Sequence, residues 1–343
     1  MGANQTLKRR KMVIKVEGTP GTWDAPATAD NNIRFRNVEI TPNIEFDDDN
    51  AKYVNGSHAE DQSIAGVQSA TVTASVRVTY GGAATTVPNW WNAAYACGLG
   101  GIGWDAGSEV AIGSAAQGIA LVSRCAYDDV SYSVVVIESE IGSSPVYTHY
   151  QLAGCMGNMT LTCEGPGKPV MANFTFTGKI NDIVDAADIP IHSTTQTALA
   201  ESYLTSATTI GGVAEKIGAW SYDYGHVVTP IYDQSDKTGI RQYVITERHP
   251  RFTCNPLGVK QATTDWLNIV LTESTPQIIV PTANTKLTVI DPQPVNFGIS
   301  SREGLVAYDH TFRALQNGTP GSLTDAALDL EDTSEFLQGA RSA

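Results

Sequence analysis

The chain has 343 residues, with 22 Lys and Arg side chains against 36 Asp and Glu, so its formal net charge is −14 at pH 7. Charged residues make up only 17% of the chain and hydrophobic residues 42%, which argues against a disordered chain and against a coiled coil. The acidic balance argues against tight general binding to nucleic acid, because that requires clustered Lys and Arg. No run of about 20 apolar residues is present, so no membrane-spanning helix is expected.

The cysteines and the N-terminus indicate in which cellular compartment the chain folds. An odd number of cysteines, spread thinly over a long chain, argues against a disulfide framework and favours a reducing compartment. The basic N-terminus is not followed by an apolar segment, so it does not resemble a signal peptide. We expect the cysteines to be small buried apolar residues. They are Cys97, Cys125, Cys155, Cys163 and Cys254.

Residues 1–32 are predicted to form an N-terminal arm. A short apolar run at residues 12–16 is followed by turn-forming Gly and Pro residues. Because this segment has little to bury by itself, we expect it to order only against something else, such as a neighbouring subunit. A basic cluster precedes the apolar run: Lys8, Arg9, Arg10 and Lys11.

Residues 33–180 are predicted to form a first β module, because the main hydrophobic period is two. In residues 70–80 Val and Ala at even positions alternate with Thr, Ser and Arg at odd positions, as in a strand with one buried and one wet face. A short helix is expected at residues 88–97, with Gly98 just beyond its end. Further strands are expected at 33–40, 118–126, 130–138, 147–152, 158–164 and 170–178, with a hairpin turn at 165–168.

The second half of the chain repeats this plan. Residues 181–216 are expected to be a connecting segment with short elements of its own, because a bare loop of that length is unusual. Residues 217–323 are predicted to form a second β module, which suggests a diverged internal duplication. Its helix is expected at 263–271, capped by Thr263 or Thr264. Its strands are expected at 220–231, 239–249, 277–280, 286–290, 295–301 and 305–313.

The last segment, residues 324–343, is predicted to be an acidic C-terminal tail. The chain is therefore basic at its start and acidic at its end. The acidic residues of the tail include Asp329, Glu331, Asp332 and Glu335.

No motif for catalysis, metal binding or cofactor binding stands out. Residues 98–103 match G-x-G-x-x-G, but a helix is expected before them rather than a strand, so a loop is favoured over a dinucleotide site. Glu138 and Glu140 could form a carboxylate pair for acid–base chemistry, but a solvated strand edge is the commoner arrangement. The six histidines are scattered, with no second ligand at metal-binding spacing. The sequence therefore predicts neither an enzyme nor a cofactor or metal site.

A series of motifs, in this order along the chain, resembles bacteriophage tail tube proteins, also called major tail proteins. Residues 16–23 (VEGTPGTW) and 38–42 (VEITP) are similar to the opening of the family, and the expected short helix ends in the family's Ala-Cys-Gly. The closest stretch is 152–178, where a Gly-Cys-Met-Gly turn, a strand and a Gly-rich hairpin lead to the strand FTFTG. The resemblance covers most of the chain except residues 181–216.

This resemblance implies a fold and a function. The fold would be mainly β, with two tandem, pseudo-duplicated antiparallel β-sandwich or barrel modules, each with a short flanking helix. Subunits would form rings whose inner sheets make one continuous β-barrel, and the rings would stack into a hollow tube of the virion. Viral DNA would pass through without specific binding during ejection into the host. No cofactor, membrane or bond chemistry is implied. Partners would be further copies and other tail proteins: terminator, distal tail and tape measure.

Three physical expectations follow for such a tube, which would be synthesised in the bacterial host cytoplasm and act in the virion. An acidic bore repels DNA and keeps it mobile, and the candidates for its lining are Asp47, Asp48, Asp49, Glu60 and Asp61. A duplicated chain can close a near-sixfold ring from three copies, which we favour over a hexamer. The basic cluster of the arm is expected to meet the acidic tail in the next ring, through a salt-sensitive contact.

Two other functions stay open. A carbohydrate-binding or adhesin β module would use exposed tryptophans as stacking platforms, and a tail terminator or baseplate hub could share the fold. The candidate platforms are Trp90, Trp91, Trp104 and Trp220.

Overall fold

The computed structural model describes thirteen segments of the chain, and it is mainly β, with 65% strand, 6% helix and antiparallel sheets. The prediction of a mainly β, antiparallel fold is confirmed. The described residues are 10–47, 64–79, 89–97, 116–119, 131–139, 146–191, 202–204, 207–258, 264–272, 276–281, 285–289, 292–314 and 336–340.

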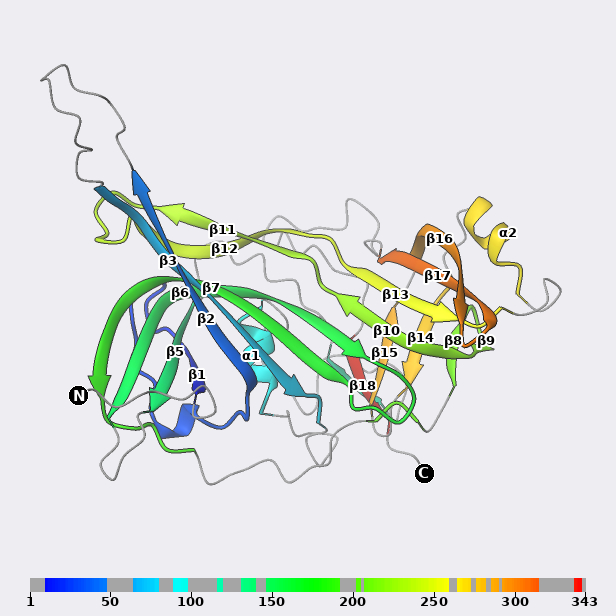
Figure 1. The fold of residues 1–343 in the computed structure, drawn as a ribbon, viewed down its shortest axis with the longest axis horizontal. Coiled ribbons are helices and arrows are strands. Elements are labelled where there is room, and N and C mark those ends of the chain that lie inside the picture. The colour runs from blue at the N-terminus through cyan, green and yellow to red at the C-terminus, as the bar shows by residue number, and fades with distance from the viewer. Residues whose placement is uncertain are drawn as a thin grey trace, which may run out of the picture.

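The largest sheet contains ten strands, and eight of them follow one another in the order β16-β17-β13-β10-β6-β7-β3-β2 (Figure 1). Every neighbouring pair on this path is antiparallel. The strands are β2 (Arg36–Asp47), β3 (Ile64–Arg77), β6 (Tyr147–Cys163), β7 (Met171–Ala186), β10 (Ile217–Asp223), β13 (Arg251–Pro256), β16 (Pro292–Arg302) and β17 (Leu305–Ala314).

The two halves of the chain contribute four strands each, in the same order. The first half supplies β2, β3, β7 and β6, and the second half continues with β10, β13, β17 and β16. We call each set a four-strand unit. β6 and β10 join the units, with Cys163 opposite Trp220 and Thr160 opposite Asp223. β16 has the place in the second unit that β6 has in the first, but among the described strands none lies beyond β16 on the path.

The two remaining strands of this sheet include part of the predicted N-terminal arm. β1 (Lys11–Val16) pairs with β5 (Tyr132–Ser139), and β5 pairs with β6. β6 and β7 curve away from the main path toward β5 and β1 (Figure 1). Residues 11–16 were expected to order only against another element, such as a neighbouring subunit, and in the structure that element is β5 of the same chain. Alternate side chains of β1 are buried on both of its faces, Met12 and Ile14 on one and Val13 on the other.

Two smaller sheets complete the strands. β11 (His226–Tyr232) and β12 (Ile240–Arg248) form a hairpin that packs on β6 and β7. A six-stranded sheet includes short elements from the predicted connecting segment and a strand from the predicted tail. Its order is β4 (Ala116–Ile119), β18 (Phe336–Ala340), β15 (Thr285–Val289), β14 (Ile278–Pro281), β8 (Thr208–Ile210) and β9 (Val213–Glu215).

Both predicted helices are present, as α1 (Trp91–Tyr95) and α2 (Trp266–Leu271), and a 3-10 turn (Thr28–Asp30) lies near the N-terminus. The predicted cap of α2 is wrong. Asp265 caps it by accepting a 3.0 Å hydrogen bond from the Asn268 backbone N–H, because the Thr264 hydroxyl donates instead to Glu215. Within the described segments, no helix has the length and apolar character needed to cross a membrane.

Two strand boundaries also differ from the prediction. Residues 147–152 and 158–164 belong to the single strand β6, because the register shifts between them without a turn. The predicted strand 220–231 is two strands, β10 and β11, separated at Gly225 (φ +61°). A Cβ at Gly225 would lie 2.3 Å from the His249 carbonyl oxygen, so the close approach of the two chains requires glycine there.

A single hydrophobic cluster runs through both halves of the chain. It joins Phe174 and Phe176 of the first predicted module to Trp220, Phe252 and Phe312 of the second. The two predicted modules therefore share one sheet and one core. The cysteines are buried and free as expected at Cys97, Cys155, Cys163 and Cys254, whereas Cys125 lies outside the described residues.

Candidate functional surface

One face of the eight-strand path is covered by hydroxyl and amide side chains. Thr73 of β3 lies opposite Thr175 of β7, which lies opposite Asn158 of β6, and the same side chain types continue across β10, β13 and β17. Directly opposite residues in a sheet share a face, so these side chains form one surface, which we call the polar face. Its uncharged members are Thr41, Asn43, Thr71, Thr73, Ser75, Asn158, Thr160, Thr162, Asn173, Thr175, Thr177, Ser221, Thr253, Asn296 and Thr311.

The opposite face of the same strands is the core. The side chains between the polar positions are buried, because the side-chain period of a strand is two. The alternation predicted for residues 70–80 is therefore confirmed, and it extends over β7, β6, β10 and β13, whereas Ile299 of β16 and Val306 of β17 are exposed on the core side. The buried positions include Val72, Ala74, Leu161, Phe174, Phe176, Trp220, Tyr222, Phe252 and Phe312.

Many groups on the polar face hydrogen-bond to one another. Asp223 Oδ1 accepts from Asn158 Nδ2 at 2.8 Å and from Thr160 Oγ1 at 3.1 Å. Asn173 Nδ2 donates to Thr162 Oγ1 at 3.0 Å. Since these donors and acceptors already have partners, this part of the face, on β6, β7 and β10, offers a wetted surface rather than free groups that would hold a ligand.

The charged side chains on the polar face are of both signs. Arg36, Arg77, Arg251 and Arg313 share the face with Glu39, Asp223 and Asp309. The five acidic residues proposed for a bore lining lie elsewhere. Asp47 is the last residue of β2, and its side chain is outside the described residues, as are Asp48, Asp49, Glu60 and Asp61. An acidic contribution from them stays a prediction.

The described part of the basic cluster has partners within its own chain. Arg10 forms an ion pair with Glu138 and donates to the Val38 carbonyl at 3.2 Å. The Lys11 ammonium lies 2.7 Å from a carboxylate oxygen of Asp188. Both pairs fasten the start of β1 to the sheet. Lys8, Arg9, Asp329, Glu331, Asp332 and Glu335 lie outside the described residues, so the inter-ring contact stays a prediction.

The Arg10 pair also settles the role of Glu138. This carboxylate is buried, and it accepts a second hydrogen bond, from the Tyr150 hydroxyl at 3.3 Å. Burial, together with the neighbouring Glu138 carboxylate, raises the pKa of Tyr150. Glu140 lies outside the described residues, as does the glycine motif at 98–103. Glu138 therefore acts in the structure as the partner of Arg10.

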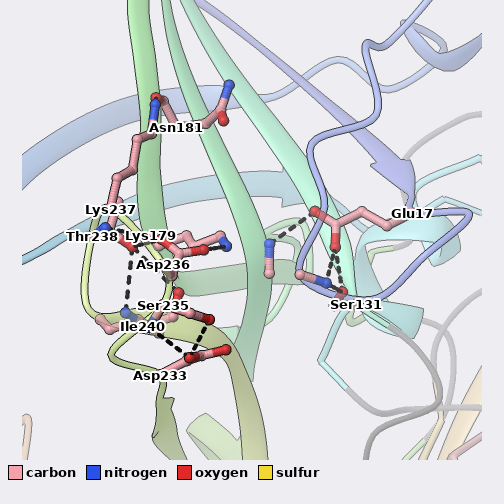
Figure 2. A network of polar contacts seen from close by, with 12 residues as sticks. Glu17, Ser131, Lys179, Asn181, Asp233, Ser235, Asp236, Lys237, Thr238 and Ile240 are labelled. Atoms are coloured by element: carbon pink, nitrogen blue, oxygen red, sulfur yellow. Dashed lines mark hydrogen bonds and ion pairs between the residues drawn. The ribbon is translucent and has the colours of Figure 1, made fainter.

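A buried carboxylate that the sequence did not single out anchors the N-terminal segment (Figure 2). Glu17 is 5% exposed and accepts hydrogen bonds from the backbone N–H groups of Gly21 and Gly154, each at 2.8 Å. The hydroxyls of Ser131 and Ser133 donate to it as well. Four hydrogen-bond donors therefore satisfy this carboxylate, and among the described residues no cation forms an ion pair with it. The motifs that carry the family resemblance contain Glu17 and Gly154, but nothing in the sequence indicated that they meet.

A second polar network fastens the tip of the β11–β12 hairpin (Figure 2). Asp236 forms an ion pair with Lys179 of β7 and accepts from the Thr238 backbone and hydroxyl at 2.9 and 2.7 Å. Burial by itself raises the pKa of Asp236, but the hydrogen bonds from Lys179 and Thr238 outweigh it and hold that pKa below its usual range. The Gln68 backbone N–H donates to the Thr238 carbonyl at 3.2 Å, so the tip is attached to β3 as well.

A cleft of about 700 Å³ lies where the β6–β7 turn, β9, β10 and the β16–β17 turn meet. Its Arg302 guanidinium donates to the carbonyls of Asn255 and Lys216, at 3.0 and 3.1 Å, and so joins three strands. Burial raises the pKa of Glu215, which lines the cleft and accepts from Thr264. The Thr264 hydroxyl that donates to this carboxylate does not itself line the cleft.

The remaining candidates for chemistry are not brought together. Among the described residues, no group of three or more His, Cys, Asp or Glu side chains is placed to hold a metal ion. Trp90 and Trp220 are buried, at 0% and 4% exposure, and cannot present a ring to a sugar. The Trp91 side chain and Trp104 lie outside the described residues.

No protein-family model matches this chain, and the search of curated proteins found no match.

Proposed function

We propose that this chain is a tail tube protein of a bacteriophage, whose copies close into rings that stack into a DNA conduit. The observation that carries the proposal is the repeated four-strand unit, which ends at β16 without the neighbour that β6 has. A second copy can supply that neighbour, as β2 of the next chain.

Strand direction allows this closure. Eight strands alternate in direction along the path, so β16 of one copy and β2 of the next would run antiparallel, as β6 and β10 do within the chain. The repeated order also supports a duplication, with modules 33–180 and 217–323 equivalent to two subunits of a simple ring. Closing the sheet on itself removes both open edges.

The exposure of β16 supports the same junction. On β6, the core-facing side chains Met159, Leu161 and Cys163 are at most 2% exposed. On β16, Ile299 lies opposite Tyr308 on the core side of the sheet and is 73% exposed. The next unit covers β6, whereas nothing in the described part of the same chain covers this part of β16. A neighbouring copy would bury Ile299 and contribute about 2 kcal/mol from that side chain alone.

The strand number favours three copies per ring. Twenty-four strands at about 4.8 Å spacing give a barrel roughly 37 Å across its backbone before strand tilt widens it. Side chains reaching about 5 Å from each wall would leave a bore of roughly 27 Å, which suits one DNA duplex. Six copies would double the circumference. We therefore propose a trimeric, pseudo-hexameric ring.

The polar face suits the wall of that bore. The side chains of Asn158, Thr160 and Thr162 on β6 are already hydrogen-bonded within the face, so over this strand a passing duplex meets water rather than fixed ligands. The proposal requires no cofactor and no reaction, and it places the chain in the virion beside terminator, distal tail and tape measure proteins. The sugar-binding alternative is weakened because Trp90 and Trp220 are buried.

Negative-stain images of the purified chain at high concentration test the proposal. We expect stacked rings with threefold or pseudo-sixfold symmetry. Ile299→Lys should leave a folded chain, because that side chain is already exposed, but abolish rings by placing a charge in the junction. Ile183→Lys, at a 51% exposed position on β7, is the matched control and should still assemble. A wild-type chain that stays monomeric at every concentration and salt would refute the proposal.

A further inference from the structure

We infer that a row of arginines across the polar face binds the phosphate groups of a DNA duplex. The inference rests on the proposed function in naming the duplex as ligand, but the row itself is a feature of the single chain. It adds a phosphate contact site to a face whose other charged residues, Arg77, Glu39 and Asp309, are of both signs.

The row crosses all eight strands. Each member lies directly opposite the next, so all eight side chains share the polar face at one level of the sheet. In sheet order from β16 to β2 they are Gln293, Arg313, Arg251, Asp223, Thr160, Asn173, Ser75 and Arg36.

The centre of the site is a pair of like charges. Arg251 of β13 lies opposite Arg313 of β17, and both side chains are exposed. Like charges directly opposite each other destabilise a sheet, so the pair is not explained by folding. Arg313 donates to Gln293, and among the described residues no carboxylate forms an ion pair with either guanidinium.

The one acid in the row is already occupied. Asp223 lies opposite Arg251, but its Oδ1 accepts from Asn158, Thr160 and the Gly225 backbone N–H. Its charge reduces the positive potential of the row without cancelling it, because Arg36, Arg251 and Arg313 outnumber it. Two arginines whose Cβ atoms lie about 5 Å apart can present two planar guanidinium groups to the oxygen atoms of a phosphate backbone.

A contact of this kind is compatible with passage of DNA. Guanidinium–phosphate contacts without base contacts are independent of sequence and exchange along the backbone, so they guide a duplex without fixing its position. One row on a neutral wall gives weak binding that salt weakens further, unlike a wall that is basic throughout.

Binding of a fluorescent 30-base-pair duplex to the full chain, followed by anisotropy from low to physiological salt, tests the row. We expect salt-sensitive binding, and Arg251→Gln with Arg313→Gln should weaken it by at least about tenfold at low salt. The slope of log affinity against log salt should fall by about 2. Arg251→Lys with Arg313→Lys keeps both charges and should keep most of the slope.

The matched control is Lys216→Gln with Arg241→Gln, which removes two exposed charges outside the row and should leave the slope unchanged. All variants are measured in the wild-type and the Ile299→Lys backgrounds, so that the face is tested with and without assembly. Equal losses in the Gln pair and the control, or no duplex binding by the wild-type chain, would overturn the inference. If the chain forms tubes but the row does not bind the duplex, the inference about the row is refuted and the proposed function stands. If the row binds the duplex but the chain never assembles, the proposed function is refuted and the inference about the row stands.

Discussion

Replacement of His310 by phenylalanine should remove the part of the pH dependence of the free energy of unfolding that comes from this buried imidazole. His310 lies on the core face of β17, 1% exposed, with its ring centroid 4.3 Å from that of Trp266 and 5.1 Å from that of Phe297. Neither ring nitrogen has a hydrogen-bond partner among the described residues. Burial lowers the pKa of His310 to about 4, although Asp309 opposes the shift.

The size and sign of the effect follow from that pKa. The unfolded chain takes up the proton near pH 6.5, whereas the folded chain stays neutral at His310 down to about pH 4. Above pH 6.5 His310 is neutral in both states, so its titration does not reduce the free energy of unfolding. As the pH falls below 6.5 the unfolded chain binds the proton first, and the free energy of unfolding decreases. Each pKa unit corresponds to about 1.4 kcal/mol, so the loss reaches about 3 kcal/mol by pH 4.

Denaturant unfolding of the unassembled chain between pH 7.5 and pH 4 measures this loss. The carboxylates titrate in both proteins, so the informative quantity is the difference between wild type and His310→Phe at each pH. The variant should gain about 3 kcal/mol relative to wild type on going from pH 7.5 to pH 4. Phe297→Leu, which disturbs the same cluster but keeps the imidazole, should retain the wild-type pH dependence. Parallel pH profiles for wild type and His310→Phe would refute the reasoning.

Two further variants test the polar networks. In Glu17→Gln an NH2 group replaces one carboxylate oxygen and faces N–H and O–H donors, so the variant should lower the free energy of unfolding by about 3 kcal/mol. The control Glu39→Gln, at an exposed position, should change that free energy by less than about 0.5 kcal/mol. A change at Glu17 no larger than that at Glu39 would contradict the role of the network. Lys179→Met leaves the partly buried Asp236 without its cation and should cost about 1–3 kcal/mol at neutral pH. Because the pKa of Asp236 lies below its usual range, the difference in free energy of unfolding between wild type and Lys179→Met should shrink as the pH falls through that range. Adding Asp236→Asn to Lys179→Met should restore part of the lost stability. A difference that does not depend on pH would argue against the ion pair.

The local patterns of the sequence predicted a large part of the elements. The two-residue period of residues 70–80 gave both the strand and its buried face, and both short helices lie within their predicted ranges. Local patterns misplaced boundaries where tertiary contacts decide. Asp265 rather than a threonine caps α2 because Thr264 is engaged by Glu215, which is distant in sequence.

The predicted N-terminal arm shows why the sequence did not identify the partner of residues 11–16, which is β5. The run at residues 12–16 is apolar on both faces, which a segment alone cannot bury. The open edge of β5 that receives it is formed more than a hundred residues later. The same applies to Glu17, whose donors come from three separate parts of the chain.

Local sequence patterns predicted the antiparallel β class, the wet and buried faces of individual strands, and the positions of the helices, because these depend on residues within a few positions of one another. Long-range packing was needed to establish that both halves share one sheet, that Arg251 meets Arg313, and that β16 ends the described path with Ile299 uncovered. Strand order and cross-strand register join residues far apart in the chain, and no local period records which strands become neighbours.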